Sequence, residues 1–354
     1  MKILHIIKDL EPGGIQTFLL DIFNNPDLTS HQMALLVIGK GRLLKNFKAS
    51  GCEIFQVKRK NIIDLKAIQD CKEVFRKFQP DIIHSHHALE ILYSNFIAPS
   101  NVKKVHTHHA HPNIDTFKDK LVYQMFLSSY DRIIYPSEFL RKQYKDEKIK
   151  SIVVNHGVDR KRVVSNLNQE KAREKLNIPI DKTILGMAGS FYNNIRNQYF
   201  ICEQLPEIFA KNQDVMMVFA GAGKSNYFQK NQYLQKCKAF CEENKIADKV
   251  VFLDNVEDIS LFYKAIDIYV HASTNDTFAL SVAEACINNL PVLINDLEVF
   301  LELYSSLENV SFFKTHHPNS FIEQVQSIIV EKKTRKNTAA FSLKDSIKQM
   351  YIGL

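Results

Sequence analysis

Short apolar runs alternate with stretches of helical periodicity along the whole chain. Each apolar run ends in a polar turn, which is typical of a strand buried on both faces. In the first part of the chain, these runs predict strands at 2–8, 33–38, 53–57, 81–85, 104–107, 132–135 and 151–155. In the second part, they predict strands at 183–188, 215–220, 249–253, 266–270 and 291–294. Because buried strands that alternate with helices form parallel sheets covered on both sides, the pattern indicates the α/β class.

The alternation is interrupted by a charged segment at 160–182 and then restarts. A chain of 354 residues is long enough for two domains of ordinary size. We therefore expect two Rossmann-like parallel-sheet domains that face a central cleft, with the site beyond the carboxyl ends of the strands. The last predicted element is a short helix at 341–351, with apolar residues at 343, 347, 350 and 351.

The composition is 45% hydrophobic and 24% charged, which is typical of a globular protein. No apolar run reaches the ~20 residues that a membrane-spanning helix needs, and the first residues lack the features of a signal peptide. The six cysteines form no Cys-x-x-Cys pair, which favours free thiols in a reducing compartment. These features predict a cytoplasmic protein.

The charge is divided unevenly along the chain. Residues 1–162 contain 26 Lys and Arg against 17 Asp and Glu, a net charge of +9, whereas residues 163–354 have a net charge of −2. The excess includes Lys40, Arg42, Lys45, Lys48, the run at 58–60, Lys103 and Lys104. A basic N-terminal half favours an anionic partner, either a membrane surface or a lipid-linked diphosphate acceptor. The alternative is a solvated surface in a lysine-rich protein.

The segment at 270–296 contains the most informative chemistry. A strand-like run is followed by small polar residues, a helix-like run and a second strand that opens at Pro291. Asp276 lies in the predicted loop and Glu284 about two turns into the predicted helix. The N–H groups of a helix N-terminus favour phosphate, and carboxylates accept hydrogen bonds from sugar or ribose hydroxyls. One segment can therefore hold both a diphosphate and the sugars attached to it.

This segment resembles the donor-binding signature of the retaining glycosyltransferases of family 4, which have the GT-B fold. That signature reads Glu, Gly or Ser, Phe, Gly, four variable residues, then Glu-Ala. Here it reads Asp276-Thr277-Phe278-Ala279, four further residues, and Glu284-Ala285. Three positions depart from the family pattern, since Asp276 replaces the first Glu, Ala279 replaces Gly, and Asn289 replaces the Gly that usually precedes Leu-Pro.

The resemblance extends over nearly the whole chain and implies a division into parts. An N-terminal domain at 1–164 would lie on the acceptor side. A C-terminal domain at 165–335 would bind a nucleotide-sugar donor. A helix within 336–354 would cross back to the N-terminal domain.

Two glycine-containing loops match the family in position. Gly13 and Gly14 follow the first strand and open a helix, and glycines there allow close backbone approach to a ligand. In the family, this loop lies beside the donor diphosphate and the acceptor. In the second domain, the family carries Gly-Arg and, about five residues later, a Lys, and both cations meet the donor phosphates. Here Ser190 stands in place of the Arg, so Arg196 is expected to hold the diphosphate, with Lys224 as a second cation.

Seven of the 13 histidines lie at two strand ends: 84, 86, 87, 106, 108, 109 and 111. Because residues two apart on a strand point to the same side, His-x-His pairs could hold a metal, which supports a metal-dependent hydrolase as a rival interpretation. The segment at 105–109 also resembles the family's Val-x-Thr-x-His strand end. That resemblance assigns His109 to the active centre, where it would orient the donor sugar or assist the proton of the incoming hydroxyl.

The resemblance implies a hexosyltransferase that moves a sugar from a UDP- or GDP-linked donor to a glycan or lipid-linked acceptor, with retention, in bacterial surface polysaccharide synthesis. Asp276 would contact the donor sugar, Glu284 the ribose, and the amides of 277–279 the diphosphate. The chain contains no Asp-x-Asp motif, which agrees with charge compensation without a metal or other cofactor. We expect no nucleic-acid partner and a cytoplasmic location, peripheral at the membrane. A non-catalytic binding subunit and a nucleotide-sugar epimerase remain alternatives.

Overall fold

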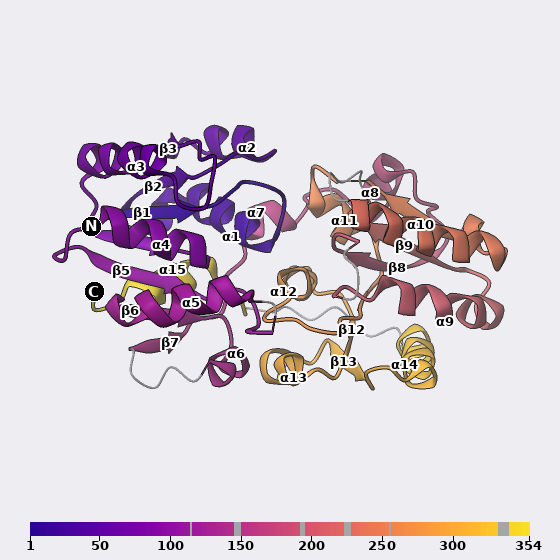
Figure 1. Cartoon of the computed structure of the whole chain (residues 1–354). Helices are drawn as coiled ribbons and strands as arrows, with labels where there is room; N and C mark the ends of the chain where they lie inside the picture. The colour runs from indigo at the N-terminus through magenta and orange to yellow at the C-terminus, as the bar shows by residue number, and fades with distance from the viewer. Residues whose placement is uncertain (114, 145–149, 192–194, 223–227, 255, 332–339) are drawn as a thin grey trace. The chain divides into compact units, whose positions relative to one another are not determined.

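The computed structural model describes residues 1–113, 115–144, 150–191, 195–222, 228–254, 256–331 and 340–354 (Figure 1). The chain folds as two compact units. Unit 1 consists of Met1–Asp159 and Phe341–Leu354, and unit 2 of Arg160–Ala340. The boundary at Asp159 lies slightly before the predicted boundary at 164, and the predicted return at 336 lies outside the described residues.

Unit 1 is built on a parallel seven-stranded sheet in the order β3-β2-β1-β4-β5-β6-β7. Its strands are β1 (Lys2–Ile7), β2 (Gln32–Val37), β3 (Glu53–Gln56), β4 (Ile82–Ser85), β5 (Lys103–Thr107), β6 (Arg132–Tyr135) and β7 (Ser151–Val153). Its helices are α1 (Gly14–Phe23), η1 (Pro26–Leu28), α2 (Leu44–Ala49), α3 (Leu65–Phe78), α4 (Ala88–Ile97), α5 (Phe117–Phe126), η2 (Leu127–Ser129), α6 (Glu138–Gln143) and α15 (Leu343–Tyr351).

Both faces of this sheet are buried, as the continuous apolar strands predict. On β1, Ile3 and Ile7 pack in one cluster with residues of α1, α2 and α15, whereas Leu4 and Ile6 pack in another with residues of α3 and α4. The alternation follows from the two-residue period of a strand. The odd-numbered face of β1, which also carries His5, is therefore the face that α15 covers.

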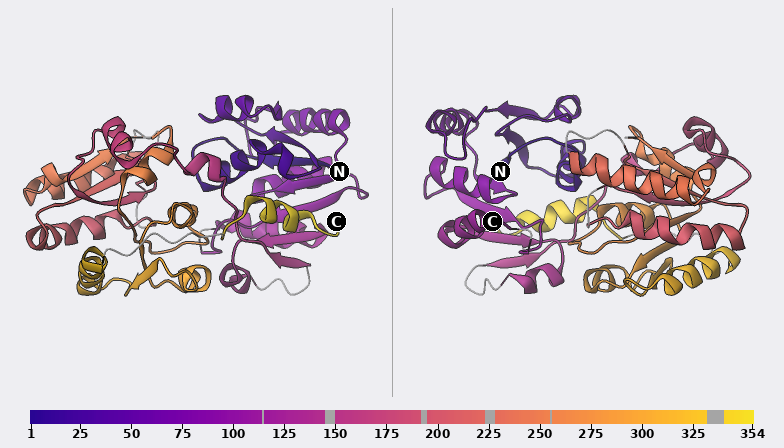
Figure 2. Two further views of the ribbon diagram at one scale, coloured as in Figure 1. Left: turned by 180° about the vertical axis from the view of Figure 1, so that it is seen from behind. Right: turned by 45° about the vertical axis from the view of Figure 1, so that its right-hand side comes forward.

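Helix α15 belongs to the core of unit 1, although it is the last element of the chain. Its residues Leu343, Ile347, Met350 and Tyr351 are all buried, which confirms the predicted apolar positions. A side chain at Gly157 would place its Cβ 2.3 Å from the Cα of Leu343, so only glycine permits this approach. In both views of Figure 2, the yellow α15 lies against the purple strands.

Unit 2 is built on a parallel six-stranded sheet in the order β10-β9-β8-β11-β12-β13. Its strands are β8 (Thr183–Ala188), β9 (Val215–Ala220), β10 (Val250–Leu253), β11 (Ile268–His271), β12 (Val292–Asn295) and β13 (Val310–Phe313). Its helices are α7 (Arg160–Val163), α8 (Gln169–Leu176), α9 (Gln198–Lys211), α10 (Phe228–Glu243), η3 (Ala247–Lys249), α11 (Ile259–Ala265), α12 (Leu280–Ile287), α13 (Glu298–Tyr304) and α14 (Pro318–Glu331).

The predicted strands are confirmed in place to within about two residues at each end, and the two Rossmann-like parallel sheets confirm the α/β fold class. Strand β13 was not predicted from the sequence. It lies at the edge of its sheet and only Phe313 in it is fully buried, so its apolar signal is weak. The six cysteines carry free thiols, and all but Cys52 are buried.

Candidate active site

In unit 2, the predicted strand–loop–helix segment is present. Strand β11 ends at His271, a loop follows, and α12 begins at Leu280. Ala279 precedes the helix with φ 57° and ψ 73°, a left-handed conformation. The family signature has Gly at this position, and Asn289, at the other Gly position, also has a positive φ of 57°. Both replacements thus keep a backbone shape that glycine adopts without strain.

Asp276 is the centre of the loop. One of its carboxylate oxygens, Oδ1, accepts backbone N–H bonds from Thr277 at 2.8 Å, Phe278 at 3.3 Å and Ala279 at 3.0 Å. The other oxygen, Oδ2, lies 2.6 Å from Nη1 of Arg196. The amides and the cation that were predicted to hold a diphosphate are therefore brought together. In this structure they hold the carboxylate of Asp276.

The environment of Asp276 keeps its carboxyl group ionised. Burial by itself would raise the pKa, but the positive charge of Arg196, helped by the backbone N–H of Thr277, outweighs it and holds the pKa of Asp276 well below its usual value. Burial also lowers the pKa of His271, which accepts a hydrogen bond from Nη1 of Arg196 at 3.1 Å through its Nε2. The cluster is a buried anion matched to one cation.

Glu284 is the fifth residue of α12, about one turn from its start and not the two turns expected, and only 5% of it is exposed. Its Oε1 accepts a 2.7 Å bond from Nη2 of Arg162, and its Oε2 accepts a 2.6 Å bond from the hydroxyl of Tyr263. An ionised carboxylate has about four acceptor positions, so these two contacts orient Glu284 and leave capacity for ribose hydroxyls.

Several residues that support this loop were not found from the sequence. Tyr304 on α13 donates its hydroxyl proton to the carbonyl oxygen of Phe278 at 2.5 Å and is within 3.2 Å of that of Ala279. Asn295, at the end of β12, bonds to both the N–H and the carbonyl group of Ser273. In the sequence, the only sign of a role for Tyr304 and Asn295 is that each is the last residue of its helix or strand. Lys224, the predicted second cation, lies outside the described residues.

In unit 1, the predicted glycine loop opens α1. Gly13 precedes the helix in an extended conformation, and Gly14 is its first residue. A Cβ at Gly14 would have no heavy atom within 4 Å, whereas one at Gly13 would meet the side chain of Gln16. The backbone at Gly14 is thus open to the approach of a ligand.

His109 follows β5 in the same unit and is half-buried. Its Nε2 lies 3.0 Å from Nδ1 of His86, and its ring stacks on that of His156 with a centroid separation of 5.2 Å. The histidine-rich strand ends are therefore in contact. They also include His5 on β1, which the sequence did not single out, because β1 and β4 pair with His5 beside His84.

The metal hydrolase interpretation rests on these histidines. Within the described residues, His5, His84 and His86 form a group whose ligand atoms lie within 4.8 Å of one another. However, the rings of His5 and His86 are 8° from parallel, with centroids 5.4 Å apart and nitrogens 3.1 Å apart. The two rings thus lie edge to edge and their nitrogens point at each other, as in a hydrogen bond and not as two ligands converging on one ion.

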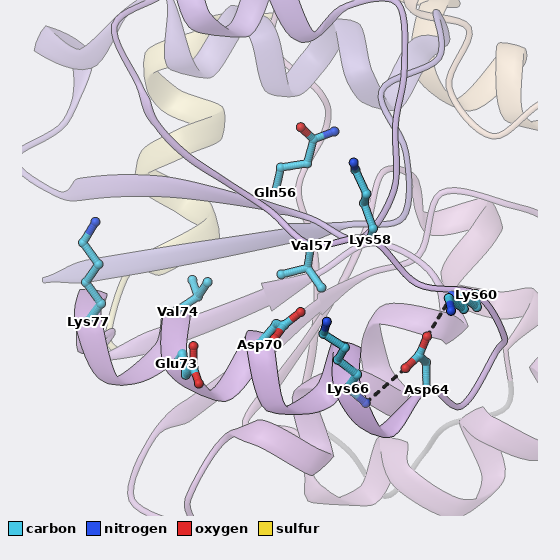
Figure 3. A pocket seen from close by; sticks show the side chains of 10 residues that line it. All are labelled: Gln56, Val57, Lys58, Lys60, Asp64, Lys66, Asp70, Glu73, Val74 and Lys77. Atoms are coloured by element: carbon cyan, nitrogen blue, oxygen red, sulfur yellow. Dashed lines mark hydrogen bonds between the residues drawn. The ribbon is translucent and has the colours of Figure 1, made fainter.

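A pocket of about 650 Å³ in unit 1 is separate from these residues. It lies between the end of β3 and α3 and is lined by Gln56, Val57, Lys58, Lys60, Asp64, Lys66, Asp70, Glu73, Val74 and Lys77 (Figure 3). Its lysines are offset by acidic residues, and Asp64 accepts the backbone N–H groups of Lys60 and Lys66. The pocket includes two lysines of the predicted basic patch and none of the predicted site residues.

Among the helices that the structure describes, none combines the length and the hydrophobicity of a membrane-spanning segment.

Both units of this chain match known glycosyltransferases in sequence. The profile described as "Glycosyltransferase Family 4" matches residues 12–162. The alpha-monoglucosyldiacylglycerol synthase of Streptococcus pneumoniae is 26% identical over 62% of this chain, and the match spans only 53% of the synthase. The O-antigen biosynthesis glycosyltransferase WclY of Escherichia coli is 21% identical over 92% of this chain and 88% of its own.

Solved structures share the fold. HepE from Anabaena, crystallised with UDP and glucose, has a TM-score of 0.83 at 16% identity, covering 99% of this chain and 98% of its own. WaaG, a glycosyltransferase involved in lipopolysaccharide biosynthesis, has a TM-score of 0.73 at 13% identity, covering 99% and 100%. A second family profile, "Glycosyl transferases group 1", matches residues 168–344, half of the chain and all of the loop around Asp276 and Glu284. The chain belongs to the glycosyl transferases group 1 family.

Proposed function

We propose that this protein is a retaining, metal-independent hexosyltransferase that moves a sugar from a UDP- or GDP-linked donor to a glycan or lipid-linked acceptor in bacterial surface polysaccharide synthesis. The observation that carries the proposal is the cluster at the start of α12, where three amides and Arg196 converge on one anion. Relatives named for O-antigen, glycolipid and lipopolysaccharide synthesis support the acceptor class.

The diphosphate of the donor would bind where the carboxylate of Asp276 now lies. The amides of Thr277, Phe278 and Ala279 and the guanidinium of Arg196 are donors suited to phosphate oxygens. A fixed cation at this position stabilises the charge that develops on the leaving diphosphate. The carboxylate of Asp276 would turn toward the hydroxyls of the donor sugar when the diphosphate takes its place.

Glu284 would accept the ribose hydroxyls. Arg162 and Tyr263 hold its two oxygens, so the carboxylate is oriented before the ligand binds. Such preorganisation reduces the entropy lost on binding.

The acceptor side would be formed by unit 1. Gly14 leaves backbone open at the start of α1, where the donor diphosphate and the acceptor would approach. His109 would contact the donor sugar or take the proton of the acceptor hydroxyl. No side chain is assigned as a covalent nucleophile.

Unit 1 also has an apolar surface suited to a membrane. On α5, Phe117 is 82% exposed, Leu121 45% and Met125 59%, and these residues, four apart, share one face of the helix. Lys118 and Lys120 lie on the same helix, within the half of the chain that has a net charge of +9. Exposed apolar side chains beside lysines favour anionic lipid.

Calorimetric titration with UDP, GDP, ADP and their common sugars, in EDTA, tests the donor site. We expect one nucleotide to bind, and Glu284→Ala to abolish the binding. Glu207→Ala, which removes an exposed carboxylate on α9, should leave it unchanged. Failure of every nucleotide to bind, both in EDTA and in a parallel titration with Mg²⁺ in place of EDTA, would contradict the proposal, and binding that requires Mg²⁺ would contradict the metal-independent mechanism.

Two further measurements test the finer parts of the proposal. Proton NMR of the product gives its anomeric configuration, and inversion would contradict retention. Co-sedimentation with anionic vesicles at low and high salt tests the membrane surface, and equal binding to neutral vesicles would contradict an electrostatic role.

A further inference from the structure

A continuous series of hydrogen bonds links the last helix of the chain to His109. It passes only through side chains of unit 1, and its members, in order, are Thr107, His84, Tyr351, His5, His86 and His109. All but His109 are buried, with at most 3% exposure. We call this series the histidine chain.

Tyr351 occupies the middle of the histidine chain. Its hydroxyl oxygen lies 2.7 Å from Nδ1 of His84 and 3.1 Å from Nε2 of His5. Two further contacts lead onward, from Nδ1 of His5 to Nε2 of His86 at 3.1 Å and from Nδ1 of His86 to Nε2 of His109 at 3.0 Å. Both nitrogens of His5 and both of His86 therefore take part.

These histidines are neutral near pH 7. Burial lowers the pKa of His5 to about 3, and burial together with repulsion from neighbouring histidines lowers the pKa of His84, His86 and His109 well below the ordinary value. A neutral imidazole has one N–H donor and one acceptor nitrogen. Each N–H of the histidine chain must therefore face an acceptor atom of the next ring or hydroxyl. Once the protonated nitrogen of one histidine is assigned, the protonated nitrogens of the others follow.

The two contacts of the Tyr351 hydroxyl indicate which group donates in each hydrogen bond of the histidine chain. Hydroxyl donors make shorter hydrogen bonds than N–H donors, so the 2.7 Å contact favours donation from Tyr351 to His84, and the 3.1 Å contact favours donation from His5 to Tyr351. The contact between His84 and Thr107 is also 2.7 Å, but a neutral His84 must donate once. Because a phenol is more acidic than an aliphatic hydroxyl, it is the better donor, and Thr107 accepts.

When Tyr351 donates to His84 and accepts from His5, all four histidines carry the proton on Nε2. His5 then accepts from His86, and His86 accepts from Nε2 of His109. The proton of His109 is thus held on the nitrogen that faces His86, and Nδ1 is the acceptor nitrogen, as a base for a hydroxyl group requires.

We propose that Tyr351 is a positioning residue which, through His5 and His86, fixes the tautomer of His109. The proposal rests on the proposed function for the role of His109, but not for the tautomer itself. It makes the packing of the C-terminal helix α15 a condition for the protonation state of His109, which follows β5. A merely structural Tyr351 would pack without controlling any proton.

The first test uses the wild-type protein. With 15N-labelled histidine, the protonated and unprotonated ring nitrogens have well-separated chemical shifts, so NMR reads the tautomer of each ring. We expect His5, His84, His86 and His109 all to carry the proton on Nε2. A proton on Nδ1 of His109 would overturn the proposal without any variant.

The second test is Tyr351→Phe. Without the hydroxyl, a proton on Nε2 of His5 would be a buried donor without its partner, which costs more than an unused acceptor. We expect His5, His86 and His109 to move their protons to Nδ1. Tyr93→Phe removes another fully buried hydroxyl from unit 1 outside the histidine chain and should leave the histidine spectrum unchanged. An unchanged spectrum in Tyr351→Phe would overturn the proposal.

Kinetics give a separate test. With UDP-glucose as the probe, Tyr351→Phe should lower kcat for UDP release by about tenfold to a hundredfold, within the contribution of a general base, and leave KM within about twofold. Equal kcat values in both proteins would overturn the proposed effect. If the wild type does not turn over UDP-glucose, the proposed donor fails, and the NMR tests still decide the tautomer.

Discussion

Replacing Asp276 by Asn should tighten the binding of UDP, although it removes the anion that Arg196 contacts. In the structure, the carboxylate accepts three backbone amides and the Arg196 guanidinium, all of which are donors suited to a diphosphate. UDP can accept hydrogen bonds from these amides and from Arg196 only after the carboxylate of Asp276 has moved away from them. Asn has the same shape and can still accept at the start of a helix, but it has no charge that repels the ligand.

The size of the effect follows from the geometry. A phosphate charge within about 4 Å of the carboxylate is repelled by about 4 kcal/mol at an effective dielectric constant of about 20. The guanidinium of Arg196 offsets part of this repulsion, and a remainder of about 1.4 kcal/mol corresponds to tenfold tighter binding. The free energy of unfolding should fall by about 1–2 kcal/mol, because the Arg196 side chain is 27% exposed and its ion pair is partly screened.

Calorimetry with UDP and urea denaturation measure both quantities. Asp258→Asn is the matched control, because Asp258 caps α11 in the same unit through the N–H of Ser260 and lies outside the candidate site. It should lower stability slightly and leave UDP affinity unchanged. If Asp276→Asn folds but binds UDP equally or more weakly than wild type, the diphosphate does not use the amides of 277–279.

Three further predictions follow from buried groups. Ala279→Gly should raise the free energy of unfolding by up to about 1 kcal/mol in urea denaturation, because φ 57° strains an L side chain, and a loss of stability would contradict the strain argument. Arg162→Met should lower stability by about 2 kcal/mol, because it breaks the ion pair of buried Glu284, and a change below about 0.5 kcal/mol would show a solvated pair. Burial raises the pKa of Glu90 to about 7, above that of the unfolded chain, so its contribution is complete below about pH 4.5 and is lost as pH rises through 7. Glu90→Gln should remove about 2.5 kcal/mol of the change in unfolding free energy between pH 5 and pH 8, measured by urea denaturation, and an equal change in the two proteins would contradict the assignment.

The fold was predictable because its signal is local. A strand covered on both faces is mostly apolar, as β9 is throughout and β1 is apart from Lys2 and His5, and each such run is visible in the sequence. Strand β13 was missed because an edge position leaves most of it half-buried. The helix α15 was predicted from its spacing of apolar residues, and its place in unit 1 was suggested by the resemblance.

The candidate site was predictable where its residues are close in sequence or match the family pattern, as Arg196 does although it lies 80 positions before Asp276. Asp276 and Glu284 lie in one segment, so their spacing suggested a shared ligand. Their partners come from elsewhere, since Arg162 precedes Glu284 by 122 positions. In the same way, His5 and Tyr351 are 346 positions apart and meet only because α15 packs on the odd-numbered face of β1.

The departures from the family signature have two physical consequences, one for the backbone and one for a side chain. Ala279, before the start of α12, and Asn289, after its end, replace glycines yet have left-handed backbones, so the backbone shape at both ends of the helix is kept at some cost in strain. The change from Glu to Asp at position 276 shortens the side chain and so changes which groups its carboxylate can contact. An aspartate is short enough to bond the amides just after it, a contact that the longer side chain of Glu disfavours. The loop therefore carries its own anion, and under the proposed function the binding of a donor would exchange one anion for another.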